Sequence, residues 1–458
     1  MGTNLKNSAA SRPLLGPVSL SLRVIIYTLV FSFSLFSQAS RADFPSFYGE
    51  TFFLKRKQQA DTRPPLKIPP TVDSTSQSSN AYQRQLSDIE STGGPYADGL
   101  AQLLLGLGRN HVSRGEYDKA IRLYGRALHN VRLNDGLYSE RQAPFVRELL
   151  DTIRLSGDLS ALDDRYDYFF RLYGSGQPPY TPLRMRATLE YLRWQREALR
   201  LGIDKQKDKR LLRLYQLNKD ILSSTWATPS YLLADQWDLT LSQIRNLYLL
   251  LSIVEPRVVI TGPGAGTMVS TVNSQDHSLD FDQRHLENIL RAAMKRGEAV
   301  LEQYIAAAQA AQPTVSVRHR ARAVLELADW YQWNGNKRRA GDTYTKVVKM
   351  LARAGQGELI QAWFDEPVEL PDNGAFWQPP VAEPGAEPTV VTATFDVTAT
   401  GKVRNITLGA DDQGKFYRFK RELSNTRFRP RYVVDADYKV QGVFTEQLSR
   451  RYELLAKR

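Results

Sequence analysis

Two segments of the chain share one pattern of large and small residues, and this pattern constrains the fold more than any other feature. In the first segment, leucines recur at helical spacing before Gly115, and a second amphipathic stretch follows that glycine. Two helices around one glycine form a helical hairpin. Matching residues return 220 positions later, from Val324 to Val347. A register shared by two distant segments predicts stacked helical hairpins over residues 96–359.

Small residues stand where the two helices of each hairpin would cross. They are Gly108 and Ala120 in the first hairpin, and Ala328 and Ala340 in the last. Bulk at these positions would push the helix axes apart. The 220-residue separation is no whole multiple of a 34-residue repeat, so the middle is predicted to hold less regular hairpins with insertions.

Both hairpins resemble tetratricopeptide repeats, which place large, small and aromatic residues at fixed offsets. The first carries the pattern on Leu104, Leu107, Gly108, His111, Gly115, Tyr117, Ala120, Tyr124 and Ala127, and the last on Val324, Leu327, Ala328, Tyr331, Gly335, Ala340, Tyr344 and Val347. The resemblance implies a mostly α fold, an α-solenoid, with an inner surface that holds an extended peptide.

The inward positions that the resemblance implies form our candidate partner-binding site. They are Gln102, Leu105, Arg109 and Val112 in the first hairpin, and Arg322, Leu325, Asp329 and Gln332 in the last. The alternative is that neighbouring hairpins or insertions cover these faces.

The last 70 residues, 389–458, change from helical to strand periodicity. Apolar residues from Val391 to Val397 alternate with Thr and Asp, and a turn at Gly401 leads to a second strand at 403–408. A helix over 414–425 and further strands near 440–444 and Tyr452 complete a small α+β domain.

This domain resembles the C-terminal domain of TonB-type energy transducers. The residues that carry the resemblance are the strand 393–398, the turn 401–403 and the sequence Arg427-Phe428-Arg429-Pro430. The resemblance implies a strand–turn–strand followed by a helix, and a setting in the cell envelope. We see no long Pro/Lys spacer, so it does not imply force transduction.

Residues 1–42 have the composition of a secretory signal peptide. Basic residues precede an apolar run from Val24 to Phe36, and small residues lead to Ala39 and Ala42. We therefore expect export, with cleavage after one of these alanines. The alternative is an uncleaved inner-membrane anchor over 18–39.

Two stretches without helical or strand period flank the helical region. Residues 43–95 are polar and Pro-containing, and residues 360–388 are rich in Pro and acidic side chains. Both are predicted to be flexible linkers.

The net charge of +12 is concentrated near the C-terminus. Residues 389–458 hold fourteen Lys/Arg and eight Asp/Glu, which is half of the excess. For an exported chain the expected anionic partners are membrane surfaces, envelope polymers or acidic proteins, and not nucleic acid. A solvated basic face is the alternative.

No motif in the chain predicts catalysis. The absence of cysteine removes disulfides and thiolate metal sites. The Gly-rich loop Thr261–Thr267 lacks the Lys-Ser/Thr of a phosphate-binding loop, and the five histidines form no zinc-protease helix. Trp330 and Trp333 are predicted to pack within the last hairpin. We therefore expect no enzyme, no cofactor and no metal.

These features together predict a scaffold or adaptor of a Gram-negative-type envelope, in the periplasm or associated with the outer membrane. It would bind protein partners through the helical surface and the basic C-terminal domain. The alternative is a TonB-like transport accessory that keeps its N-terminal anchor and couples to an outer-membrane receptor.

Overall fold

The computed structural model describes nine ranges of the chain, and all structural statements concern these ranges. They are 52–53, 76–203, 206–228, 231–253, 277–311, 314–376, 389–409, 416–435 and 440–454. The predicted signal peptide over 1–42 and the Gly-rich loop over 261–267 lie outside the described residues.

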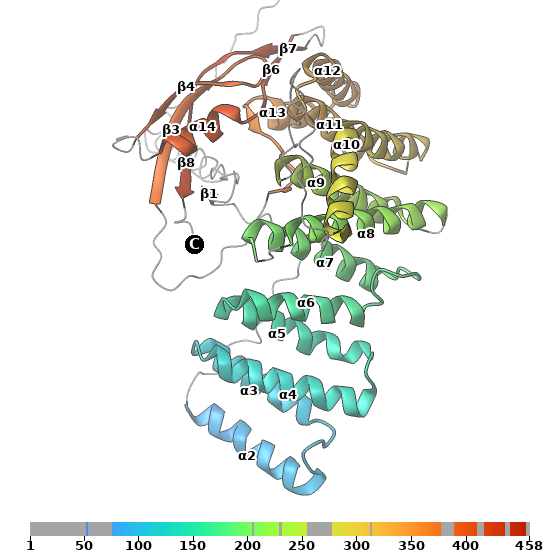
Figure 1. Ribbon diagram of the computed structural model, residues 1–458, viewed down its shortest axis with the longest axis vertical. Coiled ribbons are helices and arrows are strands. Elements are labelled where there is room, and N and C mark those ends of the chain that lie inside the picture. The colour runs from blue at the N-terminus through green and yellow to red at the C-terminus, as the bar shows by residue number, and fades with distance from the viewer. Residues whose placement is uncertain are drawn as a thin grey trace, which may run out of the picture. The chain divides into compact units, whose positions relative to one another are not determined.

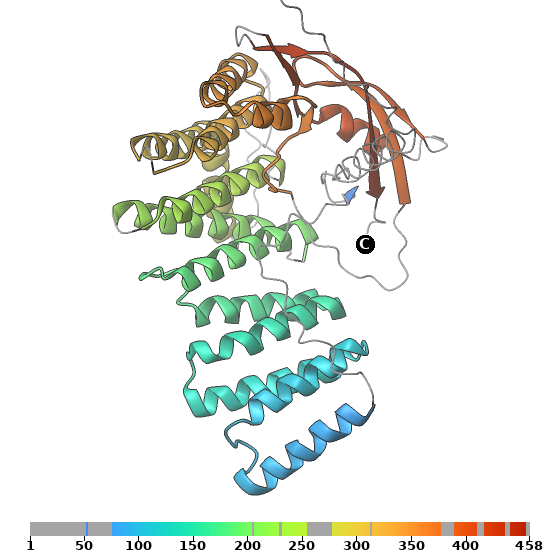
Figure 2. The same ribbon diagram turned by 180° about the vertical axis from the view of Figure 1, so that it is seen from behind.

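The protein is mostly helical, with a small sheet region near the C-terminus, as predicted. The helices are α2 (Ser76–Gly93), α3 (Leu100–Ser113), α4 (Tyr117–Asp135), α5 (Ala143–Ser156), α6 (Leu159–Leu172), α7 (Pro182–Leu201), α8 (Lys207–Ala227), α9 (Leu233–Ile253), α10 (His277–Ala310), α11 (Val317–Trp333), α12 (Lys337–Arg353) and α13 (Gly357–Phe364), with a short 3-10 helix at Glu140–Gln142 between α4 and α5. Consecutive helices pack against one another from α2 to α13 (Figures 1 and 2). In the described residues, no helix combines the length and the apolar character needed to cross a bilayer.

The small residues lie at the helix contacts, as the sequence predicts. Ala120 and Ala340 are fully buried, and so is Tyr124. A Cβ atom on Gly108 would overlap the ring of Tyr124, which reaches across from α4 to α3. A glycine at 108 therefore lets the aromatic ring lie directly against the backbone of the neighbouring helix.

Two hydrophobic clusters hold the described residues together. One runs from α3 to α7 and includes Leu104 and Trp194. The other runs from α7 to the C-terminal strands and includes Trp330, Phe395 and Phe428. The last helices and the C-terminal strands therefore share one core.

The C-terminal strands form one larger and two smaller sheets. The larger sheet has the order β1-β8-β3-β4, from β1 (Phe52–Phe53), β8 (Thr445–Leu454), β3 (Thr389–Val397) and β4 (Val403–Leu408), with β3 antiparallel to both neighbours. Val391 and Phe395 are fully buried, which confirms the alternation predicted for this strand. The helix α14 (Tyr417–Asn425) contacts β4.

One smaller sheet pairs segments on either side of α14 in the sequence, and the other pairs two segments that follow α14. β2 (Val368–Glu369) pairs with β5 (Phe428–Arg429), and β6 (Arg431–Val434) pairs with β7 (Val440–Val443). The pairing of β2 with β5 joins the end of the helical region to the C-terminal strands.

Both linker predictions are wrong where the structure describes the residues. Within 43–95, residues 76–93 form α2, whose Leu86 and Ile89 pack on the first cluster, and Phe52–Phe53 pair with β8. Within 360–388, residues up to 376 continue α13, form β2 and bury Phe376. The stretch from β2 to Phe376 shows no helical or strand period, because single side chains and strand pairing hold it. Residues 377–388 lie outside the described part of the chain.

Candidate functional site

The four inward positions of the last hairpin lie on α11, and three of them are buried, while the Arg322 side chain is 31% exposed. The N-terminus of α11 is fixed by Ser316, whose hydroxyl accepts a hydrogen bond from the His319 amide. Leu325 is fully buried, Asp329 is 2% exposed and Gln332 is 4% exposed. Residues of the C-terminal strands, and of the segment that precedes them, lie against this predicted inner face.

Asp329 binds an arginine from the Arg-Phe-Arg-Pro sequence. Arg429 Nε donates to Asp329 Oδ1 at 2.9 Å, and its Nη2 donates to Oδ2 at 2.5 Å. The Tyr344 hydroxyl also donates to Oδ1, at 2.8 Å, and Arg429 Nη1 donates to the Trp363 carbonyl at 3.0 Å. Burial alone would lower the pKa of Arg429, but the nearby Asp329 carboxylate raises it, so the guanidinium stays charged.

Gln332 holds the turn between β3 and β4 against α11. Its Nε2 donates to the carbonyls of Thr400 and Phe428, at 3.0 and 2.9 Å. Gly401 in that turn has a φ of 71°, and a Cβ there would overlap the Phe428 carbonyl and the Gln332 amide. The predicted turn at Gly401 therefore also serves as a contact with the helices.

A buried carboxylate, Glu326, lies one helical turn before Asp329. It accepts a hydrogen bond from Asn373 Nδ2 at 2.5 Å, and the Asn373 carbonyl accepts one from Arg245 Nε on α9 at 2.7 Å. Burial raises the pKa of Glu326 to about 7, although Arg322, Asn373 and Arg245 oppose this shift. The Asn373 region is thus held by polar side chains from two helices.

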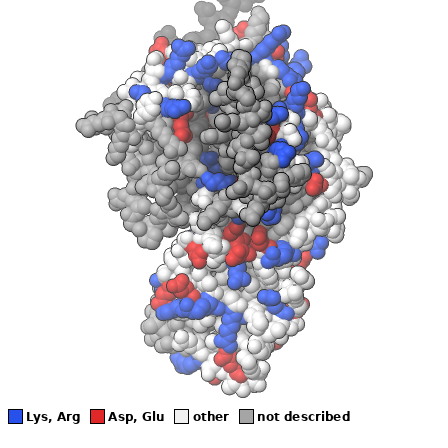
Figure 3. Space-filling model, viewed as in Figure 1, with Lys and Arg blue, Asp and Glu red and all other residues white. Residues whose placement is uncertain are grey.

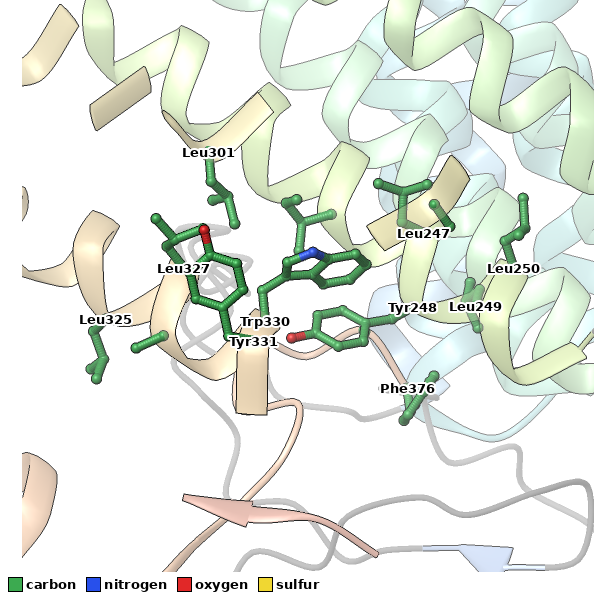
Figure 4. Packing of buried hydrophobic residues seen from close by; sticks show 14 of the residues in the cluster. Leu247, Tyr248, Leu249, Leu250, Leu301, Leu325, Leu327, Trp330, Tyr331 and Phe376 are labelled. Atoms are coloured by element: carbon green, nitrogen blue, oxygen red, sulfur yellow. The ribbon is translucent and has the colours of Figure 1, made fainter. Parts of the chain in front are cut away.

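The segment around Asn373 follows the same side of α11, α9 and α7. Asp372 pairs with Arg322 on α11 at 3.6 Å. Phe376 lies against Tyr248 on α9, with ring centroids 6.5 Å apart, and Arg200 on α7 lies 5.1 Å from its ring (Figure 4). One extended segment of the chain therefore contacts three helices in succession, as a peptide ligand would.

The two tryptophans of the last hairpin pack as predicted. Trp330 is fully buried, its indole N–H donates to the Met294 carbonyl at 3.0 Å, and its ring meets Tyr248 edge to face (Figure 4). Trp333 also contacts the Tyr248 ring. Both rings contribute to the core that the helices share with Phe376.

The four inward positions of the first hairpin are more open. Gln102 is exposed, Val112 is half-buried and Leu105 is buried. Arg109 donates from Nε and Nη2 to Glu148 Oε1 on α5, at 2.8 and 2.6 Å. The side chain of Arg109 is 38% exposed, against 13% for Glu148.

Further Arg–Glu pairs continue from α3 across α5 to α7. Arg147 on α5 pairs with Glu190 on α7 at 2.9 Å, with side chains 33% and 16% exposed. Arg193 pairs with Glu197 within α7 at 3.0 Å, with side chains 34% and 3% exposed. In each pair the guanidinium is the more exposed partner and the carboxylate lies deeper.

Arg193, the last arginine of these pairs, lies on the same face of α7 as the contact with the segment that covers α11. Arg193 and Arg200 on α7 are seven residues apart, which places them on one helix face, and Arg200 contacts Phe376. Gln102 and Arg109 have the same seven-residue spacing on α3. We call Arg109, Arg147 and Arg193 the arginine row. Figure 3 shows Lys and Arg side chains interspersed with Asp and Glu on the face that Figure 1 presents.

The arrangement is suited to binding. Within the described ranges, no group of three or more His, Asp or Glu residues is placed to hold a metal ion. Asp163 accepts hydrogen bonds from Trp194 Nε1 at 2.7 Å and from Arg210 Nη2 at 2.6 Å, so it pairs within the protein.

Sequence reasoning found Asp329, Gln332 and Arg109 but missed their partners. Arg429 is part of the sequence that carried the TonB resemblance, yet nothing local links it to Asp329, 100 residues earlier. The Arg and Glu residues on α5 and α7 were a usable signal for the arginine row, because opposite charges at helical spacing can pair within a helix or with a neighbouring helix.

No protein-family model matches this chain, and no curated protein matches it.

Proposed function

We propose that this protein is an exported binding protein of the cell envelope, a scaffold that holds a protein partner on the inner face of α3, α5 and α7. The observation that carries the proposal is the covering of α11, α9 and α7 by residues 372–376 of the same chain. The inner face of α11, α9 and α7 thus already holds an extended segment, while on α3 Gln102 and part of the Arg109 side chain are accessible to solvent.

The finer parts of the proposal rest on sequence. The helical region is a tetratricopeptide-like α-solenoid, and the C-terminal domain is TonB-like. The signal over 1–42 directs the chain to the periplasm or the outer membrane of a Gram-negative-type envelope. The basic C-terminal domain, with its excess of Lys and Arg, also contacts an anionic membrane surface or envelope polymer.

The test is a photo-crosslinking residue placed at Gln102 in the full chain, in intact cells. The matched control carries the same residue at Arg122, which is exposed on α4. We expect a discrete protein adduct from position 102 and none from position 122. Adducts of equal yield from both positions, or from neither, would contradict the proposal.

A transport accessory is the second proposal, because β3, β4 and α14 follow one another in the order that the TonB resemblance implies. It requires that residues 18–39 stay attached. N-terminal sequencing of the mature protein decides: a start at Ser40 or Asp43 ends this second proposal.

A further inference from the structure

The first and last hairpins carry opposite charges at one inner position. Arg109 on α3 and Asp329 on α11 are 220 residues apart, the separation that relates the two hairpins throughout. Asp329 holds Arg429, a basic side chain of the segment that covers α11. By the same geometry, a basic residue at this position suits an acidic side chain.

The exposure of the arginine row supports this reading. Each guanidinium is at least twice as exposed as the carboxylate that it pairs with. The two bonds from Arg109 to Glu148 use two of its five N–H groups. The paired carboxylates therefore orient the guanidiniums, and the guanidiniums are the groups of each pair that solvent reaches more.

From this charge pattern we infer that the arginine row binds an extended acidic segment of a partner protein. The inference rests on the proposed function and names the chemistry of the partner. Packed helices lie about 10 Å apart, and an extended chain in the polyproline II conformation advances about 3.1 Å per residue and returns every third side chain to the same face. Acidic side chains three residues apart in the partner segment therefore match Arg109, Arg147 and Arg193.

The probe is a fluorescein-labelled nonapeptide, (Glu-Ser-Ala) repeated three times, and its control is the same peptide with Gln for Glu. Binding to the full chain is followed by fluorescence anisotropy at several salt concentrations. We expect the acidic peptide to bind and the Gln peptide to bind at least about tenfold more weakly, because charge-assisted hydrogen bonds are lost. Equal binding of the two peptides overturns the inference.

Two triple variants test whether the acidic peptide binds to the arginine row itself or is attracted by the net charge of the protein. Arg109→Gln/Arg147→Gln/Arg193→Gln removes the arginine row. Arg122→Gln/Arg213→Gln/Arg338→Gln removes three exposed arginines elsewhere on the helices, with the same change in net charge. We expect the first to weaken acidic-peptide binding about tenfold or more, and the second by about twofold or less. Equal losses contradict the inference.

A single variant guards against a folding defect. Arg193→Gln leaves Glu197 paired with Arg154 at 3.3 Å, so it should keep the helicity and melting temperature of the parent. The variant should still bind the acidic peptide several-fold more weakly than the parent does. If the folded Arg193→Gln variant binds the acidic peptide as tightly as the parent, Arg193 is not part of the binding surface. The inference that the arginine row binds the peptide is then wrong.

Failure of the inference is distinguishable from failure of the proposed function. A specific adduct at position 102 without acidic-peptide binding leaves the scaffold proposal intact and ends the acidic-segment inference. If polygalacturonate binds in place of the peptide and loses affinity with the arginine row, the occupant is an anionic polymer, and the peptide inference is wrong.

Discussion

The first hairpin, α3 and α4, and the last, α11 and α12, share their packing but differ in what lies on their inner faces. Ala120 and Ala340 are fully buried at equivalent helix contacts. On the inner side, the Arg109 side chain is 38% exposed, whereas Asp329 is covered by Arg429 and is 2% exposed. The small residues between the helices, Ala120 and Ala340, therefore set the geometry of both hairpins. The inner residues, Arg109 and Asp329, determine separately which charge each inner face can bind.

The largest expected effect is a loss of stability when the buried ion pair of the last hairpin is removed. Asp329→Ala leaves the Arg429 guanidinium buried at 1% exposure without its carboxylate. We expect a loss of about 3–5 kcal/mol in the free energy of unfolding, since an uncompensated buried charge is costly. Urea denaturation of the full chain measures it.

The double variant Asp329→Ala/Arg429→Ala is the control, because it removes both charges. It should lose less than the sum of the two single variants. Additive losses would mean that the two side chains do not stabilise each other.

The second prediction uses pH, because only the last hairpin carries a buried carboxylate at position 326; the first has Gly106 there. Burial raises the pKa of Glu326 from 4.5 to about 7. Between these pH values the folded state binds more protons than the unfolded state, so stability falls as pH rises. The fall from this group is about 3 kcal/mol at most.

Glu326→Gln cannot release a proton, so its stability should lack this component. The measurement is the free energy of unfolding of parent and variant at several values between pH 4.5 and 7.5. The parent should lose stability relative to the variant as pH rises. A constant difference across the range would show that Glu326 keeps an ordinary pKa.

A third prediction concerns how closely the two hairpin cores match. Position 108 is Gly and the equivalent position 328 is Ala, and a methyl on Gly108 would overlap the Tyr124 ring. Gly108→Ala should cost about 1–3 kcal/mol by overpacking. Gly125→Ala on α4, which has no neighbour within 4 Å, should instead stabilise by about 0.5–1 kcal/mol. Thermal unfolding measures the stability of both variants. If Gly108→Ala leaves the melting temperature unchanged, the first hairpin has as much room for a methyl group between its helices as the last hairpin has.

The smallest effect is expected at the arginine row. Arg109→Gln removes an ion pair whose guanidinium is 38% exposed. The expected loss is below about 1 kcal/mol, because solvent screens exposed pairs. The free energy of unfolding is measured by urea denaturation. If Arg109→Gln loses as much of it as Asp329→Ala does, the two inner faces do not differ in how far their ion pairs are buried.

Much of the architecture followed from sequence because it depends on local periodicity. The spacing of leucines and small residues predicted helices around Gly108 and Ala340, and alternation predicted the strand from Val391 to Val397, with a turn at Gly401. These patterns arise from burial on one face of an element, so they are visible within a short window.

The covering of the last hairpin could not be predicted in this way. Asn373 and Phe376 lie in a stretch with no period, and it was interpreted as a linker. Arg429 meets Asp329 through a contact between distant parts of the chain, which leaves no local trace. The useful hint was the pair of polar residues, Asp329 and Gln332, among apolar and aromatic neighbours on α11, because polar groups need partners when they are buried.

The shared core of the last helices and the C-terminal strands changes how deletion experiments should be interpreted. A protein shortened at Pro388 would lose Phe428, Arg429 and the turn at Gly401, and it would expose Asp329, Gln332 and the apolar residues beside them. Any new proteins captured by such a truncated bait would report this uncovered surface. Point substitutions on solvent-facing side chains are therefore the sound way to divide the molecule into working parts.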